Sequence, residues 1–104
     1  NAVIFGSGTI GIAAAVAFQY FGMKKVMVCD YSDFRLNLAK ELGVAICNPQ
    51  KEDFAVKSKE YFGTAPSLNG QTANIDCWLD AAGAENILIS CSLGKLRVDL
   101  YLWR

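Results

Sequence analysis

The chain has 104 residues, 53% of them hydrophobic, and its ten basic residues are balanced by ten acidic ones. This length is enough to bury one hydrophobic core but scarcely two, so we expect a single domain over residues 1–104. The zero net charge excludes the broad basic surface with which proteins bind nucleic acid or anionic membranes.

The sequence predicts neither a membrane segment nor a secretion signal. Its longest apolar stretch, residues 10–18, is too short to cross a bilayer. No positively charged segment precedes an apolar run and a small-residue cleavage site, which is the pattern of a signal peptide. We therefore expect a cytoplasmic protein.

Short β-rich runs alternate with longer helical runs along the chain. The strands are predicted at residues 2–5, 26–29, 44–47, 75–79 and 96–102. The first four are almost continuously apolar, which is typical of parallel strands buried on both faces. The alternation predicts an α/β fold, a doubly wound and mostly parallel sheet of the Rossmann type, truncated, with helices on both faces.

The first strand leads into the glycine-rich segment FGSGTIG. Gly6 is expected to adopt a backbone conformation closed to other residues, and Gly11 to let the following helix pack closely on the strand. Gly8 would let the backbone approach a pyrophosphate, which would lie at the helix N-terminus. That helix, residues 10–21, is apolar almost all round and is expected to end at Gly22.

An acidic residue, Asp30, closes the second predicted strand, 19 residues after Gly11. A carboxylate there can accept hydrogen bonds from the adenosine ribose and repel a 2′-phosphate, so the motif favours NAD over NADP. The alternative is that Asp30 only caps the following turn. Arg35 could stack on adenine or tolerate a 2′-phosphate, or it could be a solvated side chain, and the sequence does not separate these roles.

The second helix is predicted over residues 33–42 and is expected to end at Gly43. Its apolar residues Phe34, Leu38 and Leu42 recur every four positions. This spacing predicts that the three side chains form the buried stripe of the helix.

The remaining segments are predicted to lie nearer the surface. Residues 51–62 are expected to form a solvated outer helix, and residues 63–73 a polar surface loop without regular structure. In residues 96–102 apolar and polar side chains alternate, which is typical of an edge strand wetted on one face. Such an edge could support self-association.

The four cysteines, Cys29, Cys47, Cys77 and Cys91, are far apart in the sequence, and the chain contains no histidine. This spacing does not match a zinc site. Three of the cysteines lie in apolar strand-like runs, where a free thiol packs as a small hydrophobic group. We expect core packing, no metal site and a reducing compartment.

The segments FGSGTIG, AAAVAFQYFG, KKVMVCD, FRLNLAKELG and IDCWLDAAG together resemble the coenzyme domain of the medium-chain dehydrogenase/reductase family. That family includes zinc alcohol, polyol and threonine dehydrogenases. The resemblance covers roughly residues 2–83. It implies that Thr9 and Ile10 line the pyrophosphate turn, that Asp30 binds the ribose, and that Ala81, Ala82 and Gly83 lie along the cofactor after the fourth strand.

The chain also departs from the family pattern. Members of the family carry a catalytic domain with the zinc ligands and the substrate pocket, and this sequence contains neither. We therefore expect a fragment that consists of the dinucleotide-binding domain. The segment after Gly83 is shorter than the corresponding family segment, and the sixth strand usual in the family is not found.

No catalytic constellation is predicted within the chain. Asp76 and Asp80 share one face of a strand, but they lie at its two ends, roughly 13 Å apart at the strand rise per residue. This separation is too long for a shared proton, so structural or cofactor-lining roles are expected. No serine has a histidine to activate it.

The sequence therefore predicts an NAD(H)-binding domain of a zinc-type alcohol or polyol dehydrogenase, an oxidoreductase that transfers hydride only as the full-length protein. The chain would bind and orient the cofactor, which itself supplies the redox chemistry. One alternative is a regulatory module that senses NAD without catalysis. Another is an isolated fold that binds nothing tightly.

Overall fold

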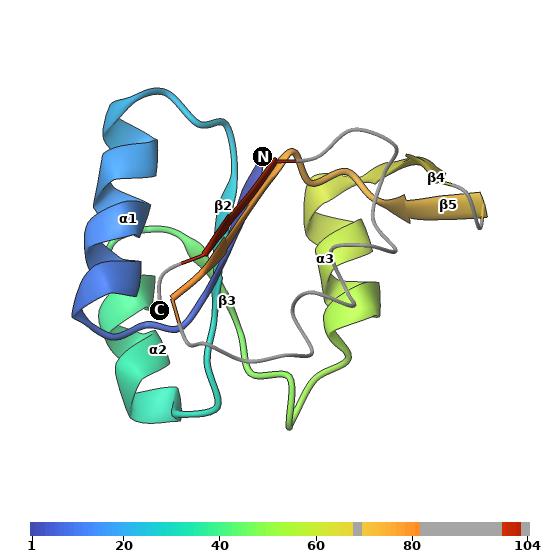
Figure 1. Cartoon of the computed structure of the whole chain (residues 1–104). Coiled ribbons are helices and arrows are strands. Elements are labelled where there is room, and N and C mark those ends of the chain that lie inside the picture. Colours follow the sequence, from blue (N-terminus) through green and yellow to red (C-terminus); the bar gives the residue numbers. More distant parts are fainter. Residues whose placement is uncertain (68–69, 82–98, 103–104) are drawn as a thin grey trace.

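The computed structural model describes residues 1–67, 70–81 and 99–102 (Figure 1). In chain order the elements are β1 (Ala2–Phe5), α1 (Thr9–Tyr20), β2 (Val26–Cys29), α2 (Asp33–Lys40), β3 (Ala45–Cys47), α3 (Phe54–Phe62), β4 (Thr64–Ser67), β5 (Gly70–Ala73), β6 (Cys77–Asp80) and β7 (Asp99–Leu102). Within this part of the chain, no helix is long and apolar enough to cross a membrane.

Five strands form one sheet in the order β3-β2-β1-β6-β7, and every neighbouring pair is parallel. The chain moves outward from β1 to β3 and then returns to the other side of β1 with β6. Because β1 and β6 are neighbours, the direction of winding reverses between these two strands. The predicted doubly wound, Rossmann-like sheet is confirmed.

Helices cover both faces of the sheet, as predicted. In Figure 1, α1 and α2 lie on one face and α3 lies on the other. Successive residues of a strand point to opposite faces. In β1, accordingly, Val3 belongs to the core cluster beneath α3, whereas Ile4 belongs to the cluster beneath α1 and α2. Both residues are completely buried.

Helix α1 is less enclosed than its apolar sequence predicts. Gly11 and Ala15 are buried, while Val16, Tyr20 and Phe21 are exposed. Within the described residues, only the stripe of α1 that faces β1 and β2 is packed. The predicted termination is confirmed: Gly22 follows the helix with a φ of 88°.

The buried stripe of α2 differs from the predicted one. Leu36 is 2% exposed and Ala39 is completely buried, whereas Phe34 is 76% and Leu38 is 48% exposed. Only Leu42, which follows the helix, packs partly against the core. The exposed pair and the buried pair both have helical spacing. The direction in which the chain enters α2 from the loop after β2 decides which pair faces the sheet. The Ser32 hydroxyl fixes this entry by accepting a hydrogen bond from the Arg35 N–H.

Helix α3 is more closely packed than a solvated outer helix. Its N-terminus is capped by the Asp53 carboxylate, which accepts hydrogen bonds from the Ala55 and Val56 N–H groups. The rings of Phe5 and Trp78 are stacked, with centroids 5.8 Å apart, and Phe54 packs against both. The aromatic side chains therefore anchor α3 to the sheet.

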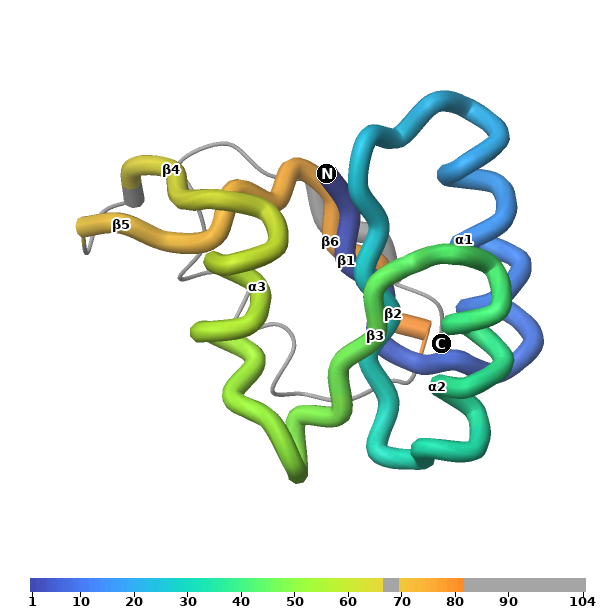
Figure 2. Tube along the Cα trace, turned by 180° about the vertical axis from the view of Figure 1, so that it is seen from behind, coloured from blue at the N-terminus to red at the C-terminus, as the bar shows by residue number. Residues whose placement is uncertain are grey.

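The predicted loop over residues 63–73 contains an antiparallel hairpin. Strands β4 and β5 pair from Thr64 opposite Ala73 to Ser67 opposite Gly70, and they extend beyond α3 on the side away from α1 and α2 (Figures 1 and 2). Gly70 has a φ of 106°, which favours glycine. The polar composition of this segment reflects its exposure rather than a lack of regular structure.

The packing prediction for the cysteines is confirmed where the structure describes them. Cys29, Cys47 and Cys77 are buried free thiols. Cys91 lies outside the described residues, as does the segment 96–98 of the last predicted strand. Strand β7 forms an edge of the sheet, and self-association through that edge stays a prediction.

The two faces of α2 provide a test of its packing. Leu36→Ala should reduce the free energy of unfolding by about 2–5 kcal/mol, because it removes a buried side chain against Ile4 and Val28. Leu38→Ala, on the exposed face of the same helix, should change it by only about 0.5 kcal/mol. Urea denaturation followed by circular dichroism measures both values, and equal losses would contradict the observed orientation of α2.

Candidate functional site

The turn between β1 and α1 requires glycine at two positions for reasons internal to the fold. Gly6 has a φ of 107°, a conformation that residues with a side chain rarely adopt. At Gly11, an added Cβ would overlap the carbonyl oxygen of Gly6. The backbone roles predicted for these two glycines are confirmed.

Gly8 differs from both, because nothing within the described structure requires glycine there. Its φ of −76° is open to any residue, and an added Cβ would meet no atom within 4 Å. Gly8 is also the N-cap of α1, where no side chain accepts a hydrogen bond and no acidic residue occupies the first turn. The glycine therefore keeps open the space beside the N-terminus of the helix.

The residues that follow Gly8 begin α1 at the surface. Thr9 and Ile10 are both exposed, in the first turn of the helix. The first N–H groups of a helix have no partner within the helix, and the helix dipole places positive charge at this end. Thr9 and Ile10 are therefore placed where a bound anion would lie.

The Asp30 carboxylate connects the end of β2 to this turn. Its Oδ2 accepts hydrogen bonds from the Ser7 N–H at 2.9 Å and the Ser7 hydroxyl at 3.0 Å, and its Oδ1 accepts one from the Ser32 N–H at 3.0 Å. Burial raises the pKa of Asp30, but the hydrogen bonds from Ser7 and Ser32 outweigh burial and hold the pKa below its ordinary value. The carboxylate is consequently ionised at neutral pH.

Ser7 is a site residue that the sequence does not identify. It occupies a variable position of the glycine motif, and its side chain is almost completely buried against Asp30. The contact spans 23 residues of sequence, so no local pattern indicates it. Ser7 makes the glycine turn and the Asp30 carboxylate one hydrogen-bonded unit.

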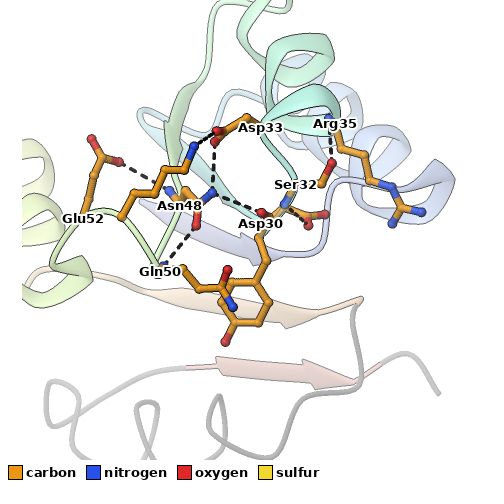
Figure 3. A network of polar contacts seen from close by, with 9 residues as sticks. Asp30, Ser32, Asp33, Arg35, Asn48, Gln50 and Glu52 are labelled. Carbon is orange, nitrogen blue, oxygen red and sulfur yellow. Dashed lines mark hydrogen bonds and ion pairs between the residues drawn. The ribbon is translucent and has the colours of Figure 1, made fainter.

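Asn48 is a second residue that sequence reasoning missed. It follows β3 and is 4% exposed. Its Nδ2 donates to the Tyr31 carbonyl at 3.1 Å and to Asp33 Oδ1 at 3.0 Å, and its Oδ1 accepts from the Gln50 N–H at 3.0 Å. In Figure 3, Asn48 lies between Asp33 and Gln50, next to the loop that carries Asp30.

Arg35 lies in the first turn of α2 and is exposed. Its N–H donates to the Ser32 hydroxyl at 3.4 Å, and its guanidinium makes no hydrogen bond or ion pair to the described residues (Figure 3). The arginine is therefore placed near Asp30 without being bound to it. Its two sequence-based interpretations both stay open.

These groups gather at the carboxyl ends of β1 and β2, beside the point where the winding of the sheet reverses. The Ala81 N–H, directly after β6, donates to the Phe5 carbonyl at 2.9 Å, so the chain leaves β6 next to the glycine turn. Ligands of open α/β sheets bind in the crevice at this reversal. The predicted cofactor-lining residues Ala82 and Gly83 lie outside the described residues.

The described residues contain no group of three or more histidine, cysteine, aspartate or glutamate side chains that could hold a metal ion. Asp76 is an exposed residue before β6, and Asp80 is the completely buried last residue of that strand. The two acidic residues are thus at opposite ends of β6. The arrangement can bind and orient a ligand through a helix N-terminus and a carboxylate.

No protein-family model matches the chain. Among curated proteins, scyllo-inosose 3-dehydrogenase of Thermotoga maritima is 36% identical over 89 residues, which are 85% of this chain and 20% of that protein. L-threonine 3-dehydrogenase of Proteus mirabilis is 33% identical over 85 residues, 81% of this chain and 23% of the relative. These homologues are polyol and threonine dehydrogenases of the medium-chain dehydrogenase/reductase family. The chain spans about a fifth of the length of these relatives.

Solved structures of dehydrogenases share the fold. The 2R,3R-butanediol dehydrogenase of Bacillus subtilis matches with a TM-score of 0.80 at 22% identity, over 99% of this chain and 28% of the other. A protein described as a short chain alcohol dehydrogenase of E. coli CFT073, complexed with NADH, matches with a TM-score of 0.72 at 26% identity, over 98% of this chain and 28% of the other. A zinc-binding dehydrogenase of Sinorhizobium meliloti 1021, bound to NADP, matches with a TM-score of 0.74 at 20% identity, over 98% of this chain and 29% of the other.

The hydrogen bond from the Ser7 hydroxyl predicts a measurable change in the pKa of Asp30. Ser7→Ala should raise that pKa, because it removes one of the hydrogen bonds that favour the charged carboxylate. A lowered pKa stabilises the fold above the pKa of the unfolded chain, and this stability is lost as the pH falls through the folded pKa. Ser7→Ala should therefore lose less stability than the wild type between pH 7 and pH 3.

Carbon-13 NMR of the Asp30 carboxyl group measures the pKa directly. Ser58→Ala serves as the control, because it also removes a buried hydroxyl but lies in α3, on the other face of the sheet from α1 and α2. The same pKa in Ser7→Ala and in the wild type would contradict the role of the hydroxyl.

Proposed function

We propose that the chain binds NAD(H) as the coenzyme domain of a zinc-type alcohol or polyol dehydrogenase. The observation that carries the proposal is Gly8: a glycine that the fold does not need, beside the uncapped N-terminus of α1. The Asp30 carboxylate is held against the same turn by Ser7. Together these groups match the two polar parts of an adenine dinucleotide, its pyrophosphate and its ribose.

The pyrophosphate would lie at the start of α1. Its negative charge suits the N–H groups and the positive dipole end of the helix, and the missing Cβ of Gly8 allows close approach. Gly6 and Gly11 set the backbone of the turn, and Thr9 and Ile10 line it. This mode of anion binding requires no lysine.

The adenosine ribose would be bound by Asp30. A carboxylate presents about four acceptor positions, and the three hydrogen bonds from Ser7 and Ser32 would leave room for a ribose hydroxyl. The same negative charge repels a 2′-phosphate, which supports a preference for NAD. The family resemblance alone does not decide this choice, because one structural neighbour holds NADH and another holds NADP.

Hydride transfer would belong to the full-length protein. The homologues are alcohol, threonine and polyol dehydrogenases, and this chain corresponds to about a fifth of their length. We infer that the zinc ligands and the substrate pocket lie in sequence outside this chain. The chain itself would bind the cofactor and direct its nicotinamide toward the substrate, while the cofactor supplies the redox chemistry.

Gly8→Val should abolish NADH binding, because its side chain would occupy the space proposed for the pyrophosphate. The fold should survive, since the φ of Gly8 is open to valine and a Cβ there meets no other atom. Calorimetric titration with NADH, together with thermal unfolding, measures both effects. A folded Gly8→Val variant that binds NADH with unchanged affinity would remove the turn from the proposed site.

Asp30→Ser should weaken NAD by roughly tenfold or more, because a hydrogen bond to a charged group contributes about 1.5–3 kcal/mol and each decade of affinity corresponds to about 1.4 kcal/mol. NADP should be weakened far less, or bound better, since the repulsive charge is removed near Arg35 and Ser32. Titration of both cofactors against both proteins measures the preference.

Asp30→Asn is the matched control for this experiment, because its amide oxygen can still accept a hydrogen bond from Ser7 while the charge is lost. It should also narrow the preference for NAD over NADP. If the ratio of NAD affinity to NADP affinity is the same in Asp30→Ser and in the wild type, Asp30 serves only the turn and not cofactor choice.

A further inference from the structure

Asn48 directly follows β3, yet its side chain donates two hydrogen bonds to the loop that follows β2. Its Nδ2 reaches across to the Tyr31 carbonyl and the Asp33 carboxylate, 17 and 15 residues away in sequence. Both partners belong to the segment that follows Asp30. We propose that Asn48 is a positioning residue for the adenosine end of the dinucleotide, an inference that rests on the proposed function.

The chemistry at this position suits an amide. Asn48 uses both Nδ2 hydrogens on acceptors, the Tyr31 carbonyl and the Asp33 carboxylate, and uses its Oδ1 to accept from the Gln50 N–H. An aspartate of the same shape can accept from Gln50 but cannot donate in its ionised form. At 4% exposure, water cannot readily replace the missing donors.

The loop that Asn48 holds is the one that directs the Asp30 carboxylate. The Asp30 N–H donates to the Cys47 carbonyl at 3.2 Å, and Asp30 Oδ1 accepts from the Ser32 N–H. Asn48 fixes the next residues of the loop, Tyr31 and Asp33. The end of β3 thus fixes the loop both at Asp30 and beyond it.

Lys51 also holds the loop after β2, because it contacts the second carboxylate oxygen of Asp33. The lysine forms an ion pair with Asp33 Oδ2, while Asn48 donates to Oδ1. The hydrogen bonds from Lys51 and Asn48 lower the pKa of Asp33, so this carboxyl stays ionised and remains an acceptor for both. Although Asp33 is exposed, both of its carboxylate oxygens have a partner, Asn48 on Oδ1 and Lys51 on Oδ2.

A carboxylate binds ribose hydroxyls well only when its direction is fixed before binding, because ordering a mobile loop costs affinity. Loss of the Asn48 bonds should therefore weaken ligands that contain the adenosine ribose. It should weaken an anion that uses only the glycine turn much less, because such an anion makes no contact with Asp30 and the backbone of the turn is set by Gly6 and Gly11. A residue that only supports the fold would affect both kinds of ligand equally.

The test uses the complete chain with Asn48→Asp and three probes: NADH, ADP-ribose and inorganic pyrophosphate. Loss of two buried donors should weaken NADH and ADP-ribose about tenfold while weakening pyrophosphate much less. Asp53→Ala is the matched control, because it removes the cap of α3, and with it a comparable amount of stability, without touching the loop. It should bind all three probes like the wild type.

Two further measurements keep the test decisive. Asp33→Ala removes one exposed partner of Asn48 and should weaken ADP-ribose severalfold, even if Asn48→Asp does not fold. Without ligand, the amide hydrogens of Ser32 and Arg35 should exchange faster in a folded Asn48→Asp variant than in the wild type. The amide hydrogens of α1 should exchange at the wild-type rate.

The outcomes separate this inference from the proposed function. Wild-type protein that binds neither NADH nor ADP-ribose would overturn both. Normal wild-type binding with unchanged ADP-ribose affinity in both loop variants would overturn the positioning role alone. Equal weakening of pyrophosphate and ADP-ribose would show that Asn48 only supports the fold, which also contradicts the inference.

Discussion

The hydrogen bonds accepted by Asp30 are the constraint on which the rest of the candidate site depends. One carboxylate joins the glycine turn after β1, through Ser7, to the start of α2, through Ser32. These bonds also keep the group ionised, because they lower its pKa against the effect of burial. The same interactions that shape the turn therefore supply the charge that would bind a ribose. A site built in this way is ordered before any ligand arrives, which reduces the cost of binding.

The three glycines of the turn illustrate how structural and functional requirements can be separated. Gly6 and Gly11 are explained by the fold itself, the first by its positive φ and the second by its contact with the Gly6 carbonyl. Gly8 has an ordinary φ and open space around it. A glycine that the fold does not explain leaves room for a group from outside the chain. The open space beside the N-terminus of α1 is the reason to propose an anion there.

The sequence predicted those features that depend on local patterns. Short apolar runs bounded by glycine or acidic residues identified β1, β2, β3 and β6, and their alternation with helices identified the parallel sheet. The buried face of α2 was not predictable from period alone, because Phe34 and Leu38 have helical spacing just as Leu36 and Ala39 do. The hairpin β4–β5 was missed because its exposed, polar residues lack the apolar alternation that marks a strand.

The residues that complete the site could not be found from the sequence, for a related reason. Ser7 and Asn48 act through partners that are 15–23 residues away, and each occupies a position where local structure permits many residue types. Their roles depend on burial and on the direction of single polar atoms, which only the folded arrangement of β1, β2 and β3 provides. The sequence thus indicated the backbone of the site, and the structure adds the side chains that hold Asp30 in place.

The proposed dinucleotide would lie across the glycine turn with its ribose at Asp30. The most direct measurement is a titration of the isotope-labelled chain with NAD, followed by two-dimensional amide NMR. We expect saturable shifts for the amides of Gly6 to Ile12 and of Asp30 to Ser32, with the amides of the hairpin β4–β5 unaffected. Shifts confined to other elements, or no saturable shift with millimolar NAD, would contradict this placement of the dinucleotide.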